Sequence, residues 1–146
     1  MAREQEVWDE INRFCFEMGN KGVKAVILFG SRAKGSHTEN SDADLCLVAN
    51  DLPKDMLERR YPAPRGYKFL SVFAFHPDEF LTMLANANPF ILDIVSYGKT
   101  VYDNGFFQQA ETSVHEVVKK YGLKRHHKGW SWEMVSAKPR ADIGCP

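Results

Sequence analysis

The sequence predicts an α+β protein of the α/β type, in which short buried strands alternate with amphipathic helices. Apolar residues near the N-terminus recur at helical spacing, and a second stretch of that kind lies near residue 110. Between them, short apolar runs bounded by glycine or polar residues have the length of strands. A length of 146 residues suits one domain. We therefore expect a single domain over residues 1–146, with its core at about 20–103 and a C-terminal helix and basic, aromatic tail over 104–146.

The first half of the chain yields one helix and three strands. Val7, Ile11, Phe14 and Met18 mark one face of a helix, because they are spaced by four, three and four residues. Residues 25–29 form an unbroken apolar run that predicts a strand buried on both sides. Residues 44–48 alternate and predict a second strand, and the aromatic run 69–75 predicts a third. The segment 50–68 carries three prolines and is expected to be an excursion with one short helix.

The second half is expected to be mainly helical. Pro77 suits a first helical turn, which predicts a helix over 77–85. A second short helix is expected over 89–95, a short edge strand over 99–102 and a closing helix from Phe106 to Tyr121. The tail from Gly122 shows no period.

Composition narrows the class of protein. Hydrophobic residues make up 44% and charged residues 26%, ordinary values for a globular protein. Nineteen basic and nineteen acidic residues cancel, which argues against nucleic-acid binding by bulk charge. Three separated cysteines, without a CxxC pair, indicate a reducing compartment. The charged N-terminus has no apolar segment typical of a signal peptide, and no apolar run approaches the ~18 residues of a membrane span. We expect a cytoplasmic protein without membrane contact.

The stretch LFGSRAKGSHTENSDADLCLV, residues 28–48, carries the candidate chemistry. Gly30 lets the backbone approach a phosphate closely, and Ser31 can cap the following helix and offers a hydroxyl. The unpaired N–H groups of a helix start favour an anion. Arg32 and Lys34 could add positive charge against a triphosphate. Taken alone, however, Gly-Ser between a strand and a helix is an ordinary cap.

Asp42 and Asp44 form an Asp-x-Asp pair at the head of the second strand. On an extended chain they point to the same face, where two carboxylates repel each other unless a cation lies between them. Mg²⁺ that carries substrate phosphates is the expected partner. Asp-x-Asp alone is more often a solvated turn, so the combination with the upstream Gly-Ser is what favours a phosphate and metal site.

GSRAKG followed by SDADL resembles the polymerase-β-like nucleotidyltransferase superfamily, in particular its minimal single-domain members, which include antitoxins paired with HEPN-family toxins. HPDEF and SYGKTVYD are also similar to the usual continuation, so the resemblance covers residues 23–103. It implies a mixed β-sheet with helices packed on one face. It also implies transfer of a nucleoside monophosphate from an NTP, expected to be ATP, to a hydroxyl of a protein or RNA acceptor, with two Mg²⁺ ions. A HEPN-type partner protein is a further implication.

The resemblance also assigns roles to residues. Ser31 would hold the β- or γ-phosphate, with Gly30, Arg32 and Lys34 in the same nucleotide site, and Asp42 and Asp44 would be the catalytic metal ligands.

One position departs from the family pattern. The family places a third carboxylate on the next strand, where this chain has Ser71 and no acidic residue. Three alternatives follow. Ser71 is not the equivalent position and the alignment is off, or Asp78, Glu79 or Asp93 substitutes and the protein is an enzyme, or the protein is a catalytically weak or inactive module that binds NTP and regulates.

Two basic segments have alternative interpretations. Residues 119–132 mix basic and aromatic side chains, which could contact RNA or a partner, but a surface tail whose tryptophans pack on the core is the favoured interpretation. Arg59, Arg60 and Arg65 could close over a triphosphate, although exposed arginines are the commoner case. Adjacent His126 and His127 lack the spacing of a zinc site.

Overall fold

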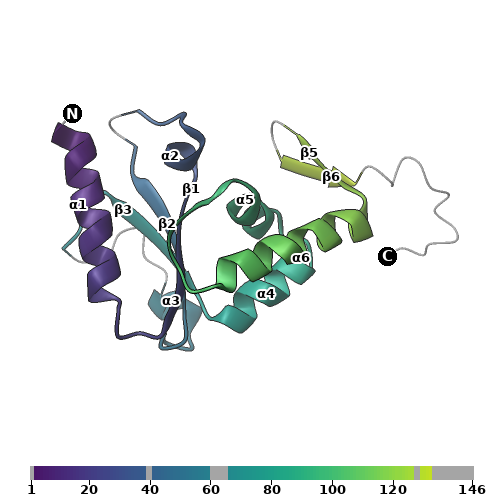
Figure 1. Cartoon of the computed structure of the whole chain (residues 1–146), viewed down its shortest axis with the longest axis horizontal. Helices are drawn as coiled ribbons and strands as arrows, with labels where there is room; N and C mark the ends of the chain where they lie inside the picture. Colours follow the sequence, from purple (N-terminus) through teal and green to yellow (C-terminus); the bar gives the residue numbers. More distant parts are fainter. Residues whose placement is uncertain (1, 39–40, 60–65, 127–128, 133–146) are drawn as a thin grey trace, which may run out of the picture.

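The computed structural model describes residues 2–38, 41–59, 66–126 and 129–132. The elements follow in the order α1 (Ala2–Glu17), β1 (Val23–Phe29), α2 (Ser31–Lys34), β2 (Ala43–Ala49), α3 (Met56–Arg59), β3 (Leu70–Phe75), α4 (Pro77–Ala85), α5 (Pro89–Tyr97), β4 (Lys99–Asp103), α6 (Phe106–Tyr121), β5 (Leu123–His126) and β6 (Gly129–Trp132). Figure 1 shows three layers: α1, then the sheet, then α4, α5 and α6.

The central sheet is mixed, as predicted. Its strand order is β3-β2-β1-β4, with β2 parallel to β3 and β1 antiparallel to both β2 and β4. β4 is an edge strand, which confirms that prediction. Since β1 ends where β2 and β3 begin, Gly30, Asp42 and Ser71 meet at one end of the sheet, which we call the carboxylate end.

Side chains of a strand alternate between the two faces of the sheet, and helices cover both faces. Ala25 and Ile27 of β1 pack with α4, α5 and α6, whereas Val26 and Leu28 pack with α1. The prediction of a strand buried on both sides is therefore confirmed. The helices expected on one face are α4, α5 and α6, and α1 covers the other face in addition.

Local signals set the helix ends. The side chain of Asn88 accepts hydrogen bonds from the N–H groups of Phe90 and Ile91 and so caps α5. Gly122 adopts a left-handed conformation that ends α6. The predicted helices over 77–85 and 106–121 therefore match α4 and α6.

The tail after Gly122 contains a structure that its sequence did not predict. β5 and β6 pair as an antiparallel hairpin. Trp130 packs against the α4–α6 cluster, and its Nε1 donates to Asp93 Oδ1 at 3.2 Å, which confirms the packing interpretation for this tryptophan. The single-domain prediction stays a prediction, because residues 133–146 lie outside the described residues.

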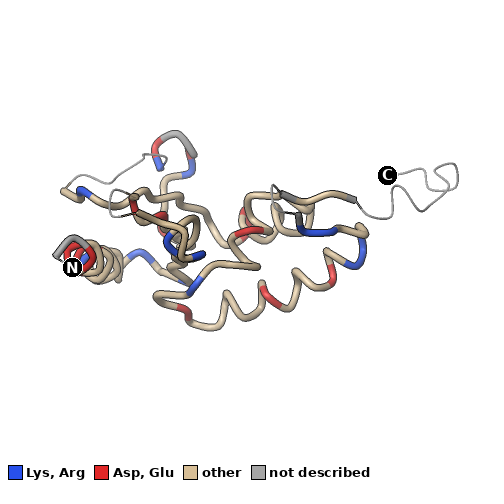
Figure 2. Tube along the Cα trace, turned by 90° about the horizontal axis from the view of Figure 1, so that it is seen from above, with Lys and Arg blue, Asp and Glu red and all other residues tan. Residues whose placement is uncertain are grey.

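Charge and hydropathy add two observations. Seen from above, acidic and basic residues are interspersed along the trace (Figure 2). Among the described residues, no helix is both long and apolar enough to cross a membrane.

Candidate nucleotide site

The Gly30–Ser31 turn at the carboxylate end depends on glycine for two reasons. Gly30 has φ of 76°, in the left-handed region that side chains disfavour. A Cβ atom on Gly30 would also overlap Asp44 Oδ2. The turn therefore lies directly against the Asp44 carboxylate, and α2 begins at Ser31 immediately after it.

The two aspartates lie close enough for their charges to interact. Asp44 is in the middle of a row across three strands, paired with Phe29 of β1 and with Ser71 of β3. Burial raises the pKa of the Asp44 carboxyl, and the neighbouring Asp42 raises it further. Asp42 is exposed and lies just before β2. A cation between the two carboxylates would relieve their repulsion.

Ser71 faces the aspartates, where the family pattern has its third carboxylate. Its hydroxyl donates to Asp42 Oδ2 at 3.4 Å. No group of three or more His, Cys, Asp or Glu residues that could hold a metal occurs in the described part of the chain. Two carboxylates fit one Mg²⁺ ion whose shell is completed by phosphate oxygens, but they do not fit a second ion with few substrate ligands.

The carboxylates considered as substitutes do not fill this gap. Glu79 is bound to Arg59 by two hydrogen bonds of 2.7 and 2.9 Å. Asp78 is exposed in the first turn of α4, beyond the opposite end of β3. Asp93 lies near α2, but its oxygens contact Lys34 at 3.5 Å, Trp130 at 3.2 Å and Arg125 at 3.1 Å.

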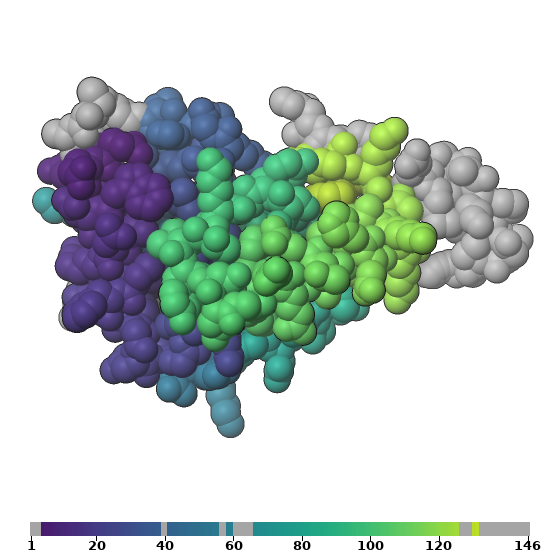
Figure 3. All heavy atoms as spheres, in the orientation of Figure 1, coloured from purple at the N-terminus to yellow at the C-terminus, as the bar shows by residue number. Residues whose placement is uncertain are grey.

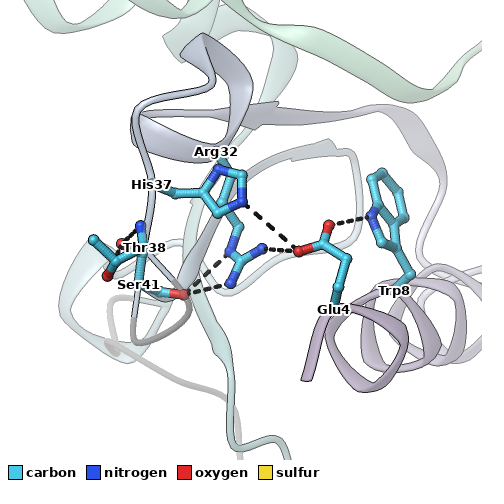
Figure 4. Close-up of polar contacts among 6 residues, drawn as sticks. All are labelled: Glu4, Trp8, Arg32, His37, Thr38 and Ser41. Carbon is cyan, nitrogen blue, oxygen red and sulfur yellow. Dashed lines mark hydrogen bonds and ion pairs between the residues drawn. The ribbon is translucent and has the colours of Figure 1, made fainter. Parts of the chain in front are cut away.

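The two basic residues of α2 point in different directions. Lys34 is exposed, and besides Asp93 its ammonium lies 5.4 Å from the centre of the Tyr97 ring. The side chain of Arg32 is only 4% exposed and is bound to Glu4 and to the carbonyl oxygen of Ser41 (Figure 4). Both side chains therefore have protein partners, but Lys34 is exposed whereas Arg32 is buried.

A model of the nucleotidyltransferase domain matches residues 9–126 of this sequence. The chain belongs to the nucleotidyltransferase domain family. The match confirms the resemblance to the polymerase-β-like superfamily and the predicted fold. A Methanocaldococcus jannaschii protein described as a "putative protein adenylyltransferase" is 29% identical over 107 residues, which cover 69% of this nucleotidyltransferase and 73% of that relative.

Two solved structures are also similar to this nucleotidyltransferase. One is a toxin–antitoxin complex with AMP-PNP, with a TM-score of 0.47, 18% identity, and coverage of 77% of this chain and 85% of that chain. The other is a mutant of the MntA–HpeT toxin–antitoxin pair, with a TM-score of 0.44, 16% identity, and coverage of 77% and 84%. Similarity at this level carries no argument about a partner.

Some residues around the candidate site had no signal in the sequence. Glu4 lies 28 positions before Arg32, and nothing in its surroundings indicated a contact with the site. Arg125 contacts Asp93 only because the hairpin folds back onto α5. The short spacing between Gly30 and Asp44, by contrast, was sufficient to predict their proximity.

Proposed function

We propose that this nucleotidyltransferase transfers AMP from Mg-ATP to a hydroxyl group of a protein acceptor. The observation that carries the proposal is the contact of the Gly30 turn with Asp44, with Asp42 and Ser71 facing the same space. The choice of ATP and of a protein acceptor is supported by the name of the archaeal relative. The balanced charge of the chain favours a protein over RNA as the acceptor.

Each residue has a proposed role at the carboxylate end. Ser31 binds the β- or γ-phosphate, because it begins α2 directly after the Gly30 turn that lies against Asp44. Lys34 leaves Asp93 and adds positive charge. Asp42 and Asp44 would hold Mg²⁺, which neutralises charge on the phosphates when it is bound.

The transfer is a displacement at the α-phosphorus. The acceptor oxygen forms a bond to this phosphorus, the bond to the oxygen that bridges to the β-phosphate breaks, and pyrophosphate leaves. The hydroxyl proton passes to solvent. The residues of this chain contribute mainly by positioning the triphosphate, which is the principal protein contribution to such reactions.

Ser71 supports a second candidate function. With a hydroxyl in place of a third carboxylate, the site can bind one Mg-NTP and still activate an acceptor hydroxyl poorly. The protein would then be a nucleotide-dependent regulatory module, and the partner expected from the resemblance is a HEPN-type protein. Measurements of AMP transfer and of nucleotide binding distinguish the enzyme from the regulatory module.

The first experiment measures thermal unfolding with each of the four NTPs at millimolar Mg²⁺. We expect Mg-ATP to raise the melting temperature, since a ligand at a hundredfold excess over its Kd stabilises the native state by about 2.7 kcal/mol. No shift with any NTP would contradict both candidates.

The second experiment follows label from [α-³²P]ATP into a protein acceptor, with the acceptor supplied by a lysate. Labelled protein supports the enzyme. A shift in melting temperature without labelled protein or RNA supports the regulatory module. Labelled RNA would show that the acceptor is RNA. Labelling must disappear in a variant that combines Asp42→Asn with Asp44→Asn.

A further inference from the structure

Arg32 lies beside the candidate site, yet its guanidinium group binds the protein itself. Its Nε and Nη2 atoms donate to the carbonyl oxygen of Ser41 at 3.1 and 3.0 Å, and Nη1 contacts Glu4 Oε1 at 2.8 Å. Figure 4 shows these contacts joining α1, α2 and the segment before β2. The sequence interpretation placed Arg32 on the triphosphate, and a phosphate contact would require these bonds to break.

The carbonyl group that Arg32 holds directly precedes Asp42. Asp42 lies outside β2, so the strand ladder that fixes Asp44 does not fix it. Ser41, which directly precedes Asp42, also forms two hydrogen bonds with Thr38. Its backbone N–H donates to Thr38 O at 3.1 Å, and its Oγ accepts from the Thr38 N–H at 3.0 Å. Arg32 therefore links the segment that carries Asp42 to the helix that begins at Ser31.

We propose that Arg32 is a positioning residue that holds Asp42 at the correct distance from the Gly30–Ser31 turn, and that Glu4 of α1 keeps its guanidinium in place. This inference rests on the proposed function, because it needs a metal bound between Asp42 and Asp44. A bidentate guanidinium fixes both the distance and the direction of its acceptor, which a lysine cannot do.

Glu4 is suited to this task by its own contacts. A guanidinium that is 4% exposed needs a counter-ion, because an unpaired buried charge is costly. The hydrogen bond from Arg32 is the largest cause that lowers the pKa of Glu4, so the carboxylate stays charged. Trp8 Nε1 also donates to Glu4 Oε2 at 3.1 Å, and His37 Nε2 lies 3.7 Å from Glu4 Oε1.

The N-terminal helix therefore contributes to the site through the contact of Glu4 with Arg32. Figure 3 shows atoms of α1 packed against those of the α2 segment at one rim of the molecule. Any change that removes Glu4 from Arg32 should loosen Asp42 and weaken metal binding.

The test measures the affinity for Mn²⁺ alone by electron paramagnetic resonance, and the KM for ATP at saturating Mg²⁺. We expect Arg32→Lys to raise the Mn²⁺ Kd about tenfold and to change the KM for ATP less than about threefold. Glu4→Gln keeps the shape but removes the charge and should raise the Mn²⁺ Kd about threefold. Circular dichroism checks that each variant is folded, and if Arg32→Lys does not fold, Glu4→Gln decides.

Two control variants sharpen the test. Glu6→Gln removes an exposed carboxylate on α1 and should leave the Mn²⁺ Kd unchanged. Lys34→Ala should raise the KM for ATP without changing the Mn²⁺ Kd. If Arg32→Lys behaves like Lys34→Ala, Arg32 is a phosphate ligand and the inference is wrong. If neither Arg32→Lys nor Glu4→Gln changes the Mn²⁺ Kd, the inference is also overturned. If the wild-type protein binds neither Mn²⁺ nor Mn-ATP, the proposed function itself is contradicted.

Discussion

Two buried arginines hold backbone carbonyl groups at opposite ends of the sheet. Arg32 does so at the carboxylate end, and Arg59 does so where β3 ends, with hydrogen bonds to Ala74 O at 3.3 Å and Lys54 O at 3.1 Å. Each is paired with one glutamate, Glu4 for Arg32 and Glu79 for Arg59. The side chain of Arg59 is only 1% exposed. The two ends therefore use the same chemistry to fix a loop.

The segments that the two arginines hold differ. The carbonyl held by Arg32 precedes Asp42, which is exposed, whereas the carbonyls held by Arg59 belong to Lys54, just before α3, and to Ala74, within β3. Of the three arginines for which exposure or contact with a triphosphate was considered, Arg59 does neither, because it is buried and bound to Glu79 and two carbonyl oxygens, whereas Arg60 and Arg65 lie outside the described residues. A buried arginine fixes the position of the segment that it binds. Whether this affects a site depends on the residues that the segment carries.

Asp42→Asn combined with Asp44→Asn should have the largest effect, at the carboxylate end. We expect transfer to fall more than about 100-fold, since a metal supplies several kcal/mol of charge stabilisation in the transition state. The melting temperature without metal should not fall, because the two carboxylates repel each other. Transfer assays and Mn-ATP binding measure the loss. An unchanged affinity for Mn-ATP would show that the metal assignment is wrong.

Glu79→Gln is the corresponding change at the other end and should affect stability alone. It leaves Arg59 buried without its counter-ion, which should cost about 2 kcal/mol at neutral pH after allowance for the partial exposure of Glu79. Urea unfolding measures this cost, and transfer below the melting temperature should stay at the wild-type rate. Lost transfer in a folded variant would break the comparison between the two ends.

The cost of Glu79→Gln should depend on pH. The hydrogen bond from Arg59 is the main cause that lowers the pKa of Glu79 to about 2, from 4.5. Because the pKa of Glu79 is lower in the folded state than in the unfolded state, the ionised carboxylate stabilises the fold. This stabilisation is complete above pH 4.5 and is lost as the pH falls through 2. The difference between wild type and variant should therefore shrink over this range in urea titrations. A difference that is constant with pH would contradict the ion pair.

Ser71→Asp should increase transfer about tenfold, because a third carboxylate can help to hold a second metal. The added repulsion means that the gain should appear only with Mg²⁺ present. The measurement is AMP transfer by wild type and variant over a Mg²⁺ titration with one acceptor. Robust wild-type transfer that falls in the variant at every Mg²⁺ concentration would contradict the role of Ser71.

Lys34→Ala should have the smallest effect, a rise of about threefold in the KM for ATP, because an exposed charge contributes about 0.5–1 kcal/mol. Lys119→Ala removes an exposed lysine from the last turn of α6 and serves as the control. Steady-state kinetics at two salt concentrations measure the effect, which should weaken at high salt. An effect of Lys119→Ala as large as that of Lys34→Ala would show that only the overall charge matters.

Local signals in the sequence determined the four strands of the central sheet, most helix ends and the pair of motifs at the carboxylate end. Pro77 has a fixed φ that suits a first helical turn, and Gly122 readily adopts the left-handed conformation that ends a helix, so the limits of α4 and α6 could be predicted. Gly30 and Asp44 come together because two adjacent strands need only a short connection between them. Family resemblance then identified Ser71 as the unusual position.

Only the tertiary structure decided the partners of the charged side chains. A long side chain can reach a phosphate, a carbonyl group or a carboxylate, and its own sequence neighbourhood does not distinguish them. Arg32 was expected at the triphosphate, but Glu4 and Ser41 O bind it, and Arg59 binds Glu79. Glu4 reaches Arg32 because the apolar face of α1 packs against the sheet. The burial of apolar surface drives this packing and does not itself specify a partner for a charge, so the partners are known only from the complete fold.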